Sequence, residues 1–240
     1  CYNRGGHTVW NRYEAVMLGV FFYRLVWLAL WVLRHVWWNW KINGRAQLRP
    51  RGQAMILAVN HLHWTDTCVL GASLPLSLQP TWMAKAELFA HPVAAWWLRA
   101  INVIPVNRGR QGLSALVAAE EALVRGAALI IFIEGHRSAT GGLQEGQGGA
   151  VRLAARCGCP IVPIALWGTE AGLGGICLRK PIRVSIGEPY FVPTDGSKIS
   201  QQRMNELNDE LMLRLAALLP ERYWGVYRER IEHSDGKLTR

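Results

Sequence analysis

Five short runs rich in Ile, Val, Leu and Ala are the feature of this sequence that most limits how it can fold. Each is dense in Ile, Val and Leu, which is typical of strands covered on both faces. Stretches with helical spacing of apolar residues lie between or after them, at 113–124 and 199–219. This alternation predicts an α/β fold with a mostly parallel or mixed sheet flanked by helices. We expect the strands at Met55–Val59, Asn102–Val106, Ala128–Ile133, Ile161–Trp167 and Ile182–Ile186.

The N-terminal region predicts a helical segment that interacts with a membrane. Residues 15–33 are apolar except for Arg24, and six Trp residues fall within the first forty positions. An Arg at the centre of a spanning helix costs about 2.5–3.5 kcal/mol, which makes a full crossing the second choice. We favour a helix or bent helical hairpin lying in the interface, with Arg24, Arg34 and Lys41 reaching lipid headgroups. A membrane span and an ordinary core helix remain alternatives.

These patterns divide the chain into three parts. We expect an apolar, Trp-rich anchor, a catalytic domain, and a polar, basic and peripheral C-terminal tail, at residues 1–40, 41–220 and 221–240. With 240 residues and 50% apolar composition the chain is long and apolar enough for a folded core, which excludes a disordered or fibrous protein.

The charge balance predicts an anionic partner. The chain carries a formal charge of +10, and its Trp residues crowd beside Arg, Leu and Val, which favours an anionic membrane surface over nucleic acid. Five cysteines lack the spacing of a disulfide framework, so a reducing environment is expected. We therefore expect a membrane-associated protein with its functional site on the cytoplasmic side.

A candidate catalytic pair follows the first predicted strand. His61 and Asp66 lie where strand ends of α/β sheets carry ligand sites. With His61 on the loop and Asp66 in the first turn of the next helix, the carboxylate would accept one imidazole N–H. The other ring nitrogen would then be free to take a proton from a hydroxyl. No serine accompanies the pair, which implies that the substrate supplies the attacking hydroxyl.

Two further strand ends carry charged side chains. Glu134 and Arg137 follow the strand that ends near Ile133, and Arg108 follows the one that ends at Val106. Arg137 is suited to hold a phosphate bidentately, while Glu134 would orient Arg137 or bind a polyol hydroxyl. A solvated salt bridge at a strand end is the structural alternative.

In four ordered blocks the sequence resembles the 1-acylglycerol-3-phosphate acyltransferase family, within the wider glycerolipid acyltransferases. The resemblance covers residues 43–193, and its blocks are Asn60-His61 with Asp66, Ile104 to Arg108, Phe132 to Ser138, and Ile161 to Ile164. It implies that His61 is the general base and Asp66 its partner. It also implies that the glycerol phosphate acceptor is bound by Arg108, Glu134, Gly135 and Arg137.

The same resemblance implies a reaction in phospholipid biosynthesis without a metal or other cofactor. A fatty acyl group would pass from acyl-CoA or acyl-ACP (acyl carrier protein) to a free hydroxyl of a lyso-phospholipid, with 1-acylglycerol-3-phosphate the favoured acceptor. Three positions depart from the family pattern, namely Ile133 for Pro, His136 for Thr, and Gln147 where many members have Lys nearby. These departures leave the acceptor headgroup open.

Two other functions remain as alternatives. His61 and His63 form a His-x-His pair of the kind that chelates zinc in hydrolases, although Thr65 stands where the metallo-β-lactamase-like pattern needs Asp. The basic charge also suits a non-catalytic membrane-binding protein, and no nucleic-acid-binding motif is present.

Overall fold

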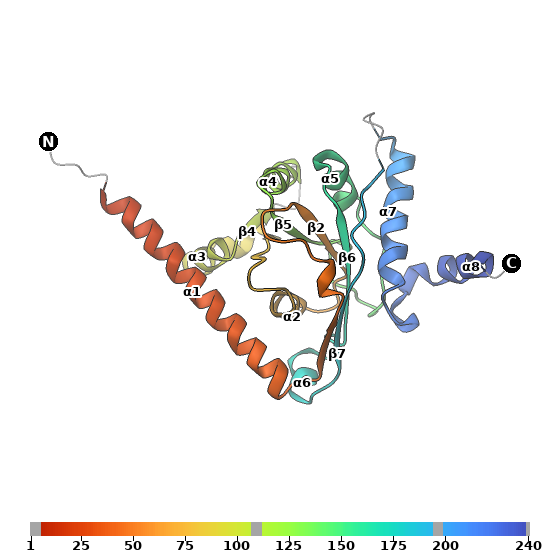
Figure 1. The fold of residues 1–240 in the computed structure, drawn as a ribbon, viewed down its shortest axis with the longest axis horizontal. Coiled ribbons are helices and arrows are strands. Elements are labelled where there is room, and N and C mark those ends of the chain that lie inside the picture. The colour runs from red at the N-terminus through yellow and green to blue at the C-terminus, as the bar shows by residue number, and fades with distance from the viewer. Residues whose placement is uncertain (1–5, 107–111, 194–198, 239–240) are drawn as a thin grey trace.

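A five-stranded mixed sheet forms the centre of the molecule (Figure 1). The computed structural model describes residues 6–106, 112–193 and 199–238. The strand order is β1-β7-β6-β2-β5, in which β6 and β7 pair antiparallel and the other neighbours pair parallel. The predicted α/β class with a mixed sheet is confirmed. The strands of this sheet are β1 (Trp40–Asn43), β2 (Met55–Val59), β5 (Ala128–Phe132), β6 (Ile161–Trp167) and β7 (Ile182–Ile186).

A parallel pair of short strands, β3 (Trp82–Lys85) and β4 (Val103–Val106), continues the layer beyond β5. Thr81 joins the two sheets, because its N–H donates to the Ala128 carbonyl at 2.8 Å and its own carbonyl accepts from Ile130 N at 2.9 Å. β1 and β3 were not predicted from the sequence. Each has four residues, which is too short to show a periodic pattern.

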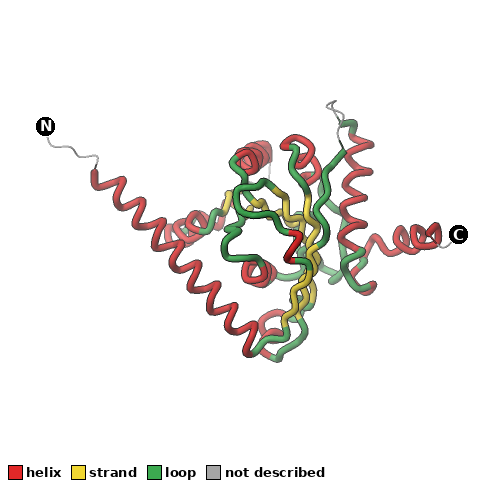
Figure 2. Tube along the Cα trace, viewed as in Figure 1, coloured by secondary structure: helices red, strands yellow, loops and turns green. Residues whose placement is uncertain are grey.

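Helices cover both faces of the sheet (Figure 2). One face packs against α2, α3, α6 and part of α1, and the other packs against α4, α5 and α7. The C-terminal α8 continues from the second face. The helices are α1 (Gly6–Val36), α2 (Asp66–Ser73), α3 (Pro92–Ala100), α4 (Gly112–Val124), α5 (Gly149–Cys157), α6 (Gly172–Cys177), α7 (Gln201–Ala216) and α8 (Arg228–Leu238).

Strand β2 is buried along its whole length. Met55, Leu57 and Val59 face the α2 side, while Ile56 and Ala58 face the α5 and α7 side. All five belong to apolar clusters, so both faces of the strand are covered and neither face carries a polar side chain. β5 and β6 flank β2 in parallel, which brings the C-terminal ends of the three strands to one edge of the sheet.

α1 is one continuous helix rather than a hairpin, and it packs on α3 and α2. Gly19 allows the approach, since a Cβ there would lie 2.1 Å from Ala100 Cβ. The segment Leu18–Val36 is long and apolar enough to cross a membrane, and only 6% of it is buried against the rest of the protein. Trp40, which the sequence grouped with the anchor, is instead a buried residue of β1 whose indole N–H donates to Ser73 Oγ at 3.1 Å.

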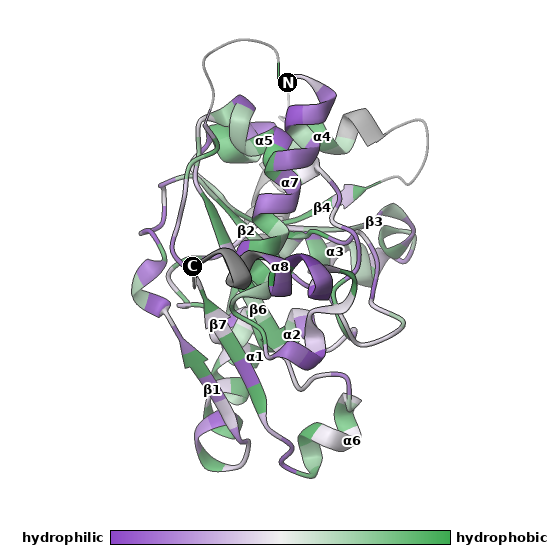
Figure 3. Cartoon of the chain, turned by 90° about the vertical axis from the view of Figure 1, so that its right-hand side faces the viewer, coloured by the Kyte–Doolittle hydropathy of each residue, from purple (hydrophilic) through white to green (hydrophobic). Residues whose placement is uncertain are grey.

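α7 has the amphipathic pattern that its sequence predicts, with its polar side facing outward (Figure 3). The helix begins after Ser200, whose Oγ accepts a hydrogen bond from Arg203 N, and it buries Leu207, Leu211 and Leu215.

The segment after Pro220, which the sequence presents as peripheral, contributes the buried side chains of Tyr223, Tyr227 and Ile231 to the same core. It contains two short 3-10 turns, Glu221–Tyr223 and Gly225–Tyr227, before α8.

Candidate active site

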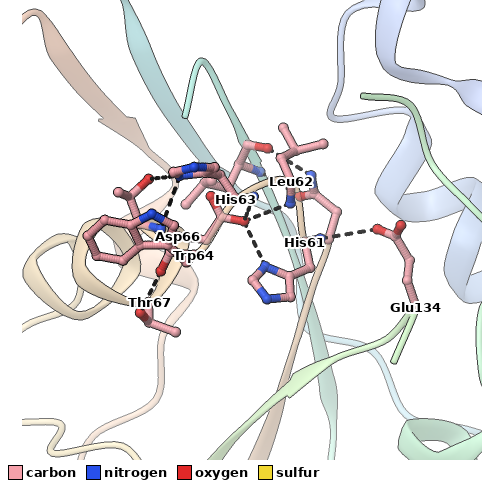
Figure 4. A network of polar contacts seen from close by, with 10 residues as sticks. His61, Leu62, His63, Trp64, Asp66, Thr67 and Glu134 are labelled. Atoms are coloured by element: carbon pink, nitrogen blue, oxygen red, sulfur yellow. Dashed lines mark hydrogen bonds and ion pairs between the residues drawn. The ribbon is translucent and has the colours of Figure 1, made fainter. Parts of the chain in front are cut away.

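His61 and Asp66 meet at the C-terminal end of β2 (Figure 4). His61 lies on the loop after the strand, and Asp66 is the first residue of α2. The imidazole Nδ1–H donates to Asp66 Oδ2 at 2.8 Å. No described residue hydrogen-bonds to Nε2, and 16% of the His61 side chain is exposed. The carboxylate therefore selects the tautomer in which Nε2 carries the free lone pair.

The loop folds around one carboxylate oxygen. Asp66 Oδ2 also accepts the backbone N–H groups of Leu62 at 2.7 Å and His63 at 2.8 Å, so three donors converge on it. Asp66 is fully buried, and a negative charge in the first turn of a helix is favoured by the helix dipole. Its other oxygen, Oδ1, is buried without a hydrogen-bond partner among the described residues. All these contacts fall within five residues of sequence.

Two residues fix where this loop starts. The buried Asn60 amide makes two 2.8 Å hydrogen bonds to the backbone of Leu166, donating to its carbonyl and accepting from its N–H. These bonds tie the end of β2 to β6. The His61 ring stacks on Phe132 with 4.0 Å between ring centroids and 21° between planes, which limits rotation of the imidazole.

Glu134 contacts His61 through the main-chain N–H of His61. Its Oε1 accepts the His61 backbone N–H at 3.1 Å, and its Oε2 accepts the Gln144 N–H at 3.3 Å. The side chain is 1% exposed, and this burial raises the pKa of Glu134 to about 7 despite the two N–H donors. Glu134 would have to become exposed before its carboxyl group could contact a bound acceptor. No ion pair joins Glu134 to Arg137 within the described residues.

The other predicted acceptor residues lie on or beyond the same loop. Gly135 has φ of +72°, a left-handed conformation that favours glycine, and forms the turn after β5. Arg137 is exposed and makes no hydrogen bond or ion pair to another described residue. Arg108 falls in the segment 107–111, outside the described residues. The structure thus brings His61, Asp66 and Glu134 together and leaves Arg137 facing solvent nearby in the chain.

Sequence reasoning missed several contacts of the loop after β5. Ser138 N donates to the His61 carbonyl at 2.8 Å, and Gln144 supports Glu134. His136 Nδ1 donates to the Glu134 carbonyl at 2.8 Å, and its Nε2 lies 3.0 Å from Gln144 Oε1. No local pattern signals these contacts, because they depend on how the loop returns over the strand end.

The His63 ring contacts Thr65, whereas the His61 ring contacts Asp66. Its Nδ1 lies 3.0 Å from Thr65 Oγ1 and accepts weakly from Thr65 N at 3.4 Å. Within the part of the chain that the structure describes, no group of three or more His, Cys, Asp or Glu side chains is placed to hold a metal ion.

Comparison with known proteins identifies the family. A family model described as Acyltransferase matches residues 40–167, which run from β1 to the end of β6 and include the whole His61 loop. The chain belongs to the acyltransferase family. A Brassica napus chloroplastic 1-acyl-sn-glycerol-3-phosphate acyltransferase, BAT2, is 31% identical over 163 residues, covering 65% of this chain and 45% of the relative.

Other acyltransferases extend the comparison. A Pseudomonas aeruginosa lyso-ornithine lipid O-acyltransferase is 33% identical over 128 residues, covering 52% of this chain and 46% of the relative. This chain thus spans about half the length of these two curated relatives. The crystal structure of the Thermotoga maritima 1-acyl-sn-glycerophosphate acyltransferase PlsC shares the fold, with a TM-score of 0.63 at 20% identity over 86% of this chain and 81% of that one.

Proposed function

We propose that this acyltransferase moves a fatty acyl group from an acyl thioester to a free hydroxyl of a lyso-glycerophospholipid. The observation that carries the proposal is the His61–Asp66 pair, with Nδ1 held by a buried carboxylate and Nε2 left without a partner among the described residues. A base arranged in this way, with no enzyme hydroxyl or thiol bound to it, suits direct attack by a substrate alcohol.

The proposed steps use the His61–Asp66 pair. His61 Nε2 takes the proton of the acceptor hydroxyl while the oxygen attacks the thioester carbonyl carbon. The tetrahedral intermediate then collapses, the C–S bond breaks, and the imidazolium returns its proton to the departing thiolate of CoA or acyl carrier protein. Asp66 stabilises the positive imidazolium between these steps, as a buried carboxylate at 2.8 Å is placed to do.

The acceptor side of the proposal rests on Arg137. An exposed guanidinium without a described partner can form a bidentate pair with a phosphate, and it lies one residue from His136 and three from Glu134. Arg108 joins it only by the family resemblance. We take 1-acylglycerol-3-phosphate as the reference acceptor, which would place the reaction in phospholipid biosynthesis. The names of several relatives, including BAT2, support this choice.

The proposal is tested by mass spectrometry of products. The purified chain is given acyl-CoA or acyl carrier protein donors and a panel of lyso-lipids. We expect a diacyl product from at least one lyso-glycerophospholipid, formed by the wild type and not by His61→Ala. Equal product from both proteins, or membrane binding with no acyl transfer to any acceptor, would contradict the proposed function and favour a non-catalytic membrane-binding protein.

Membrane attachment through α1 is a second part of the proposal. The helix exposes large apolar side chains along its length, among them Phe21, Leu25 and Leu28, which are 50–59% exposed. Burying such surface in lipid is favourable by about 25 cal/mol per Å². The cysteines within the described residues are free, and together with a CoA or carrier-protein donor this supports an active site that faces the cytoplasm.

Co-sedimentation with anionic vesicles tests the attachment. Phe21→Glu combined with Leu25→Glu should move the protein to the supernatant, because charges on this face oppose insertion. Val117→Glu, an exposed valine of α4 on the opposite side of the sheet, is the matched control and should still sediment. Equal sedimentation of all three proteins would contradict attachment through α1.

A further inference from the structure

A cavity of about 630 Å³ lies beside the loop that follows β5. One wall comes from residues 136–147 of that loop, including His136, Glu145 and Gln147, and the other comes from Gly225 and Val226 of the C-terminal segment. The family match ends at residue 167, so this second wall belongs to a part of the chain that the family resemblance does not cover.

The cavity is close to the catalytic base. His136 lies midway between Glu134 and Ser138, and both of these residues hydrogen-bond the backbone of His61, at 3.1 Å and 2.8 Å. One turn of the loop therefore separates the His61 main chain from the cavity wall. The cavity wall and the contacts to the His61 main chain thus belong to the same loop.

The C-terminal segment holds the cavity open in a defined shape. Leu143 N donates to the Tyr223 carbonyl at 2.8 Å, and Val226 N donates to the Leu143 carbonyl at 3.1 Å. Gly225 permits this contact, since a Cβ there would lie 2.0 Å from the Leu143 carbonyl oxygen. Gly146 N adds a 3.3 Å bond to Tyr227 Oη. These bonds fix both walls before a ligand arrives, which lowers the ordering cost of binding.

The lining favours a cationic group. Although the chain has a net charge of +10, no Lys or Arg among the described residues lines this cavity. The exposed Glu145 carboxylate does line it, and it has no ion pair within the same described part of the chain. Gln147 and Thr140 add neutral hydrogen-bonding groups. An ammonium would pair with Glu145, while a phosphate placed there would meet a like charge.

We propose that this cavity binds an ammonium-bearing headgroup of the lyso-lipid acceptor, and that the C-terminal segment thereby determines acceptor specificity. The proposal rests on the proposed acyl transfer and names its acceptor class. The acceptor phosphate lies at Arg137 outside the cavity, and the ammonium beyond it contacts Glu145. Acceptors with a bare phosphate leave the cavity empty.

The test compares two acceptors that differ by an aminoethyl group, 1-acylglycerophosphoethanolamine and 1-acylglycerol-3-phosphate. We expect wild-type kcat/KM for the amine acceptor to equal or exceed that for the phosphate acceptor. Val226→Trp, at a position 59% exposed, should fill the cavity and lower kcat/KM about tenfold for the amine acceptor only. Glu145→Gln should lower the same value about threefold to fivefold, as expected for an exposed ion pair.

Matched controls are Val124→Trp on α4 and Glu188→Gln after β7, which are exposed and should leave both acceptors unchanged. A wild-type preference of more than tenfold for the phosphate acceptor, or an acceptor ratio unchanged in both cavity variants, would overturn the proposal.

A binding measurement separates this proposal from the proposed function. Calorimetry with glycerophosphoethanolamine and glycerol 3-phosphate needs no acyl transfer. Tighter binding of the amine compound that is lost in Val226→Trp supports the cavity even if no acceptor is acylated. Equal or weaker binding of the amine compound overturns it even if acylation proceeds.

Discussion

Two loops leave the same edge of the sheet from neighbouring strands, and they are held in different ways. The loop of residues 60–66 after β2 is fixed mainly by Asp66, which binds groups no more than five residues away. The loop of residues 133–148 after β5 has local contacts too, but it is also held by residues far along the chain. Gly146 binds Tyr227 across 81 positions and Asn208 across 62.

Under the proposed function, this difference separates proton transfer from the choice of acceptor. His61 and Asp66 form a local unit whose geometry is set by a strand end and a helix start. The adjoining loop takes its shape from α7 and the C-terminal segment, so changes there can alter acceptor binding without disturbing the pair. Glu134 and Ser138 connect the two loops, since Glu134 accepts the N–H of His61 and of Gln144 and Ser138 N donates to the His61 carbonyl.

Replacing the base should have the largest effect. His61→Ala removes proton transfer, and we expect kcat to fall at least about 1000-fold, within the range of general-base contributions. The fold should be retained, because the His61 side chain is partly exposed and packs mainly on Phe132. Acyl-transfer assays and circular dichroism on one preparation measure both quantities. Turnover within tenfold of wild type would show that the local loop does not carry the chemistry.

Removing the charge of the carboxylate should have the next largest effect. In Asp66→Asn the three donors that meet at Oδ2 would keep the amide oxygen in that position. The tautomer of His61 is then preserved, and only the stabilisation of the imidazolium is lost. We expect kcat to fall about 100-fold, less than for His61→Ala. A loss equal to that of His61→Ala would indicate that the loop itself had collapsed.

The connecting residue Glu134 should make stability depend on pH. Its pKa is raised from 4.5 to about 7 in the folded protein, so between these values the folded state keeps a proton that the unfolded chain releases. The free energy of unfolding therefore falls as pH rises from about 4.5 to about 7, by roughly 2–3 kcal/mol from this group. Denaturant unfolding of wild type and Glu134→Gln across this range isolates the contribution.

Glu134→Gln should lack that slope, whatever its stability at any single pH. Glu188→Gln is the control for loss of an exposed carboxyl group and should follow the wild-type curve. Parallel curves for wild type and Glu134→Gln would show that Glu134 keeps its ordinary pKa in the folded protein.

Removing the hydrogen bond between Tyr227 and the loop of residues 133–148 should have the smallest effect. Tyr227→Phe leaves Gly146 N–H without its 3.3 Å partner, and we expect a loss of about 1 kcal/mol in stability and a severalfold fall in kcat/KM for the acceptor. Tyr190→Phe is a matched control, because the Tyr190 hydroxyl is buried without a partner among the described residues and its removal should be neutral or stabilising. Identical behaviour of the two variants would show that the C-terminal segment does not support the loop.

The same contrast, between contacts that are close in sequence and contacts that are far apart in sequence, explains which features the sequence could predict. β2, β6 and β7 have the predicted bounds, because β2 and β6 are continuous apolar runs covered on both faces and β7 alternates buried Ile and Val with partly exposed polar residues. The pairing of His61 with Asp66 also follows from a strand end and a helix start five residues apart. The main-chain contacts of Glu134 and the burial of Tyr227 depend on tertiary packing, which leaves no periodic signal in a polar tail.

The central claim, that His61 and Asp66 act as one unit on the acceptor hydroxyl, is tested most directly by a double-mutant cycle. Acyl-transfer rates are measured for His61→Ala, Asp66→Asn and the combined variant. If the carboxylate acts only through the imidazole, Asp66→Asn causes no further loss once His61 is replaced, and the double variant equals His61→Ala. Losses that multiply in the double variant would contradict the account.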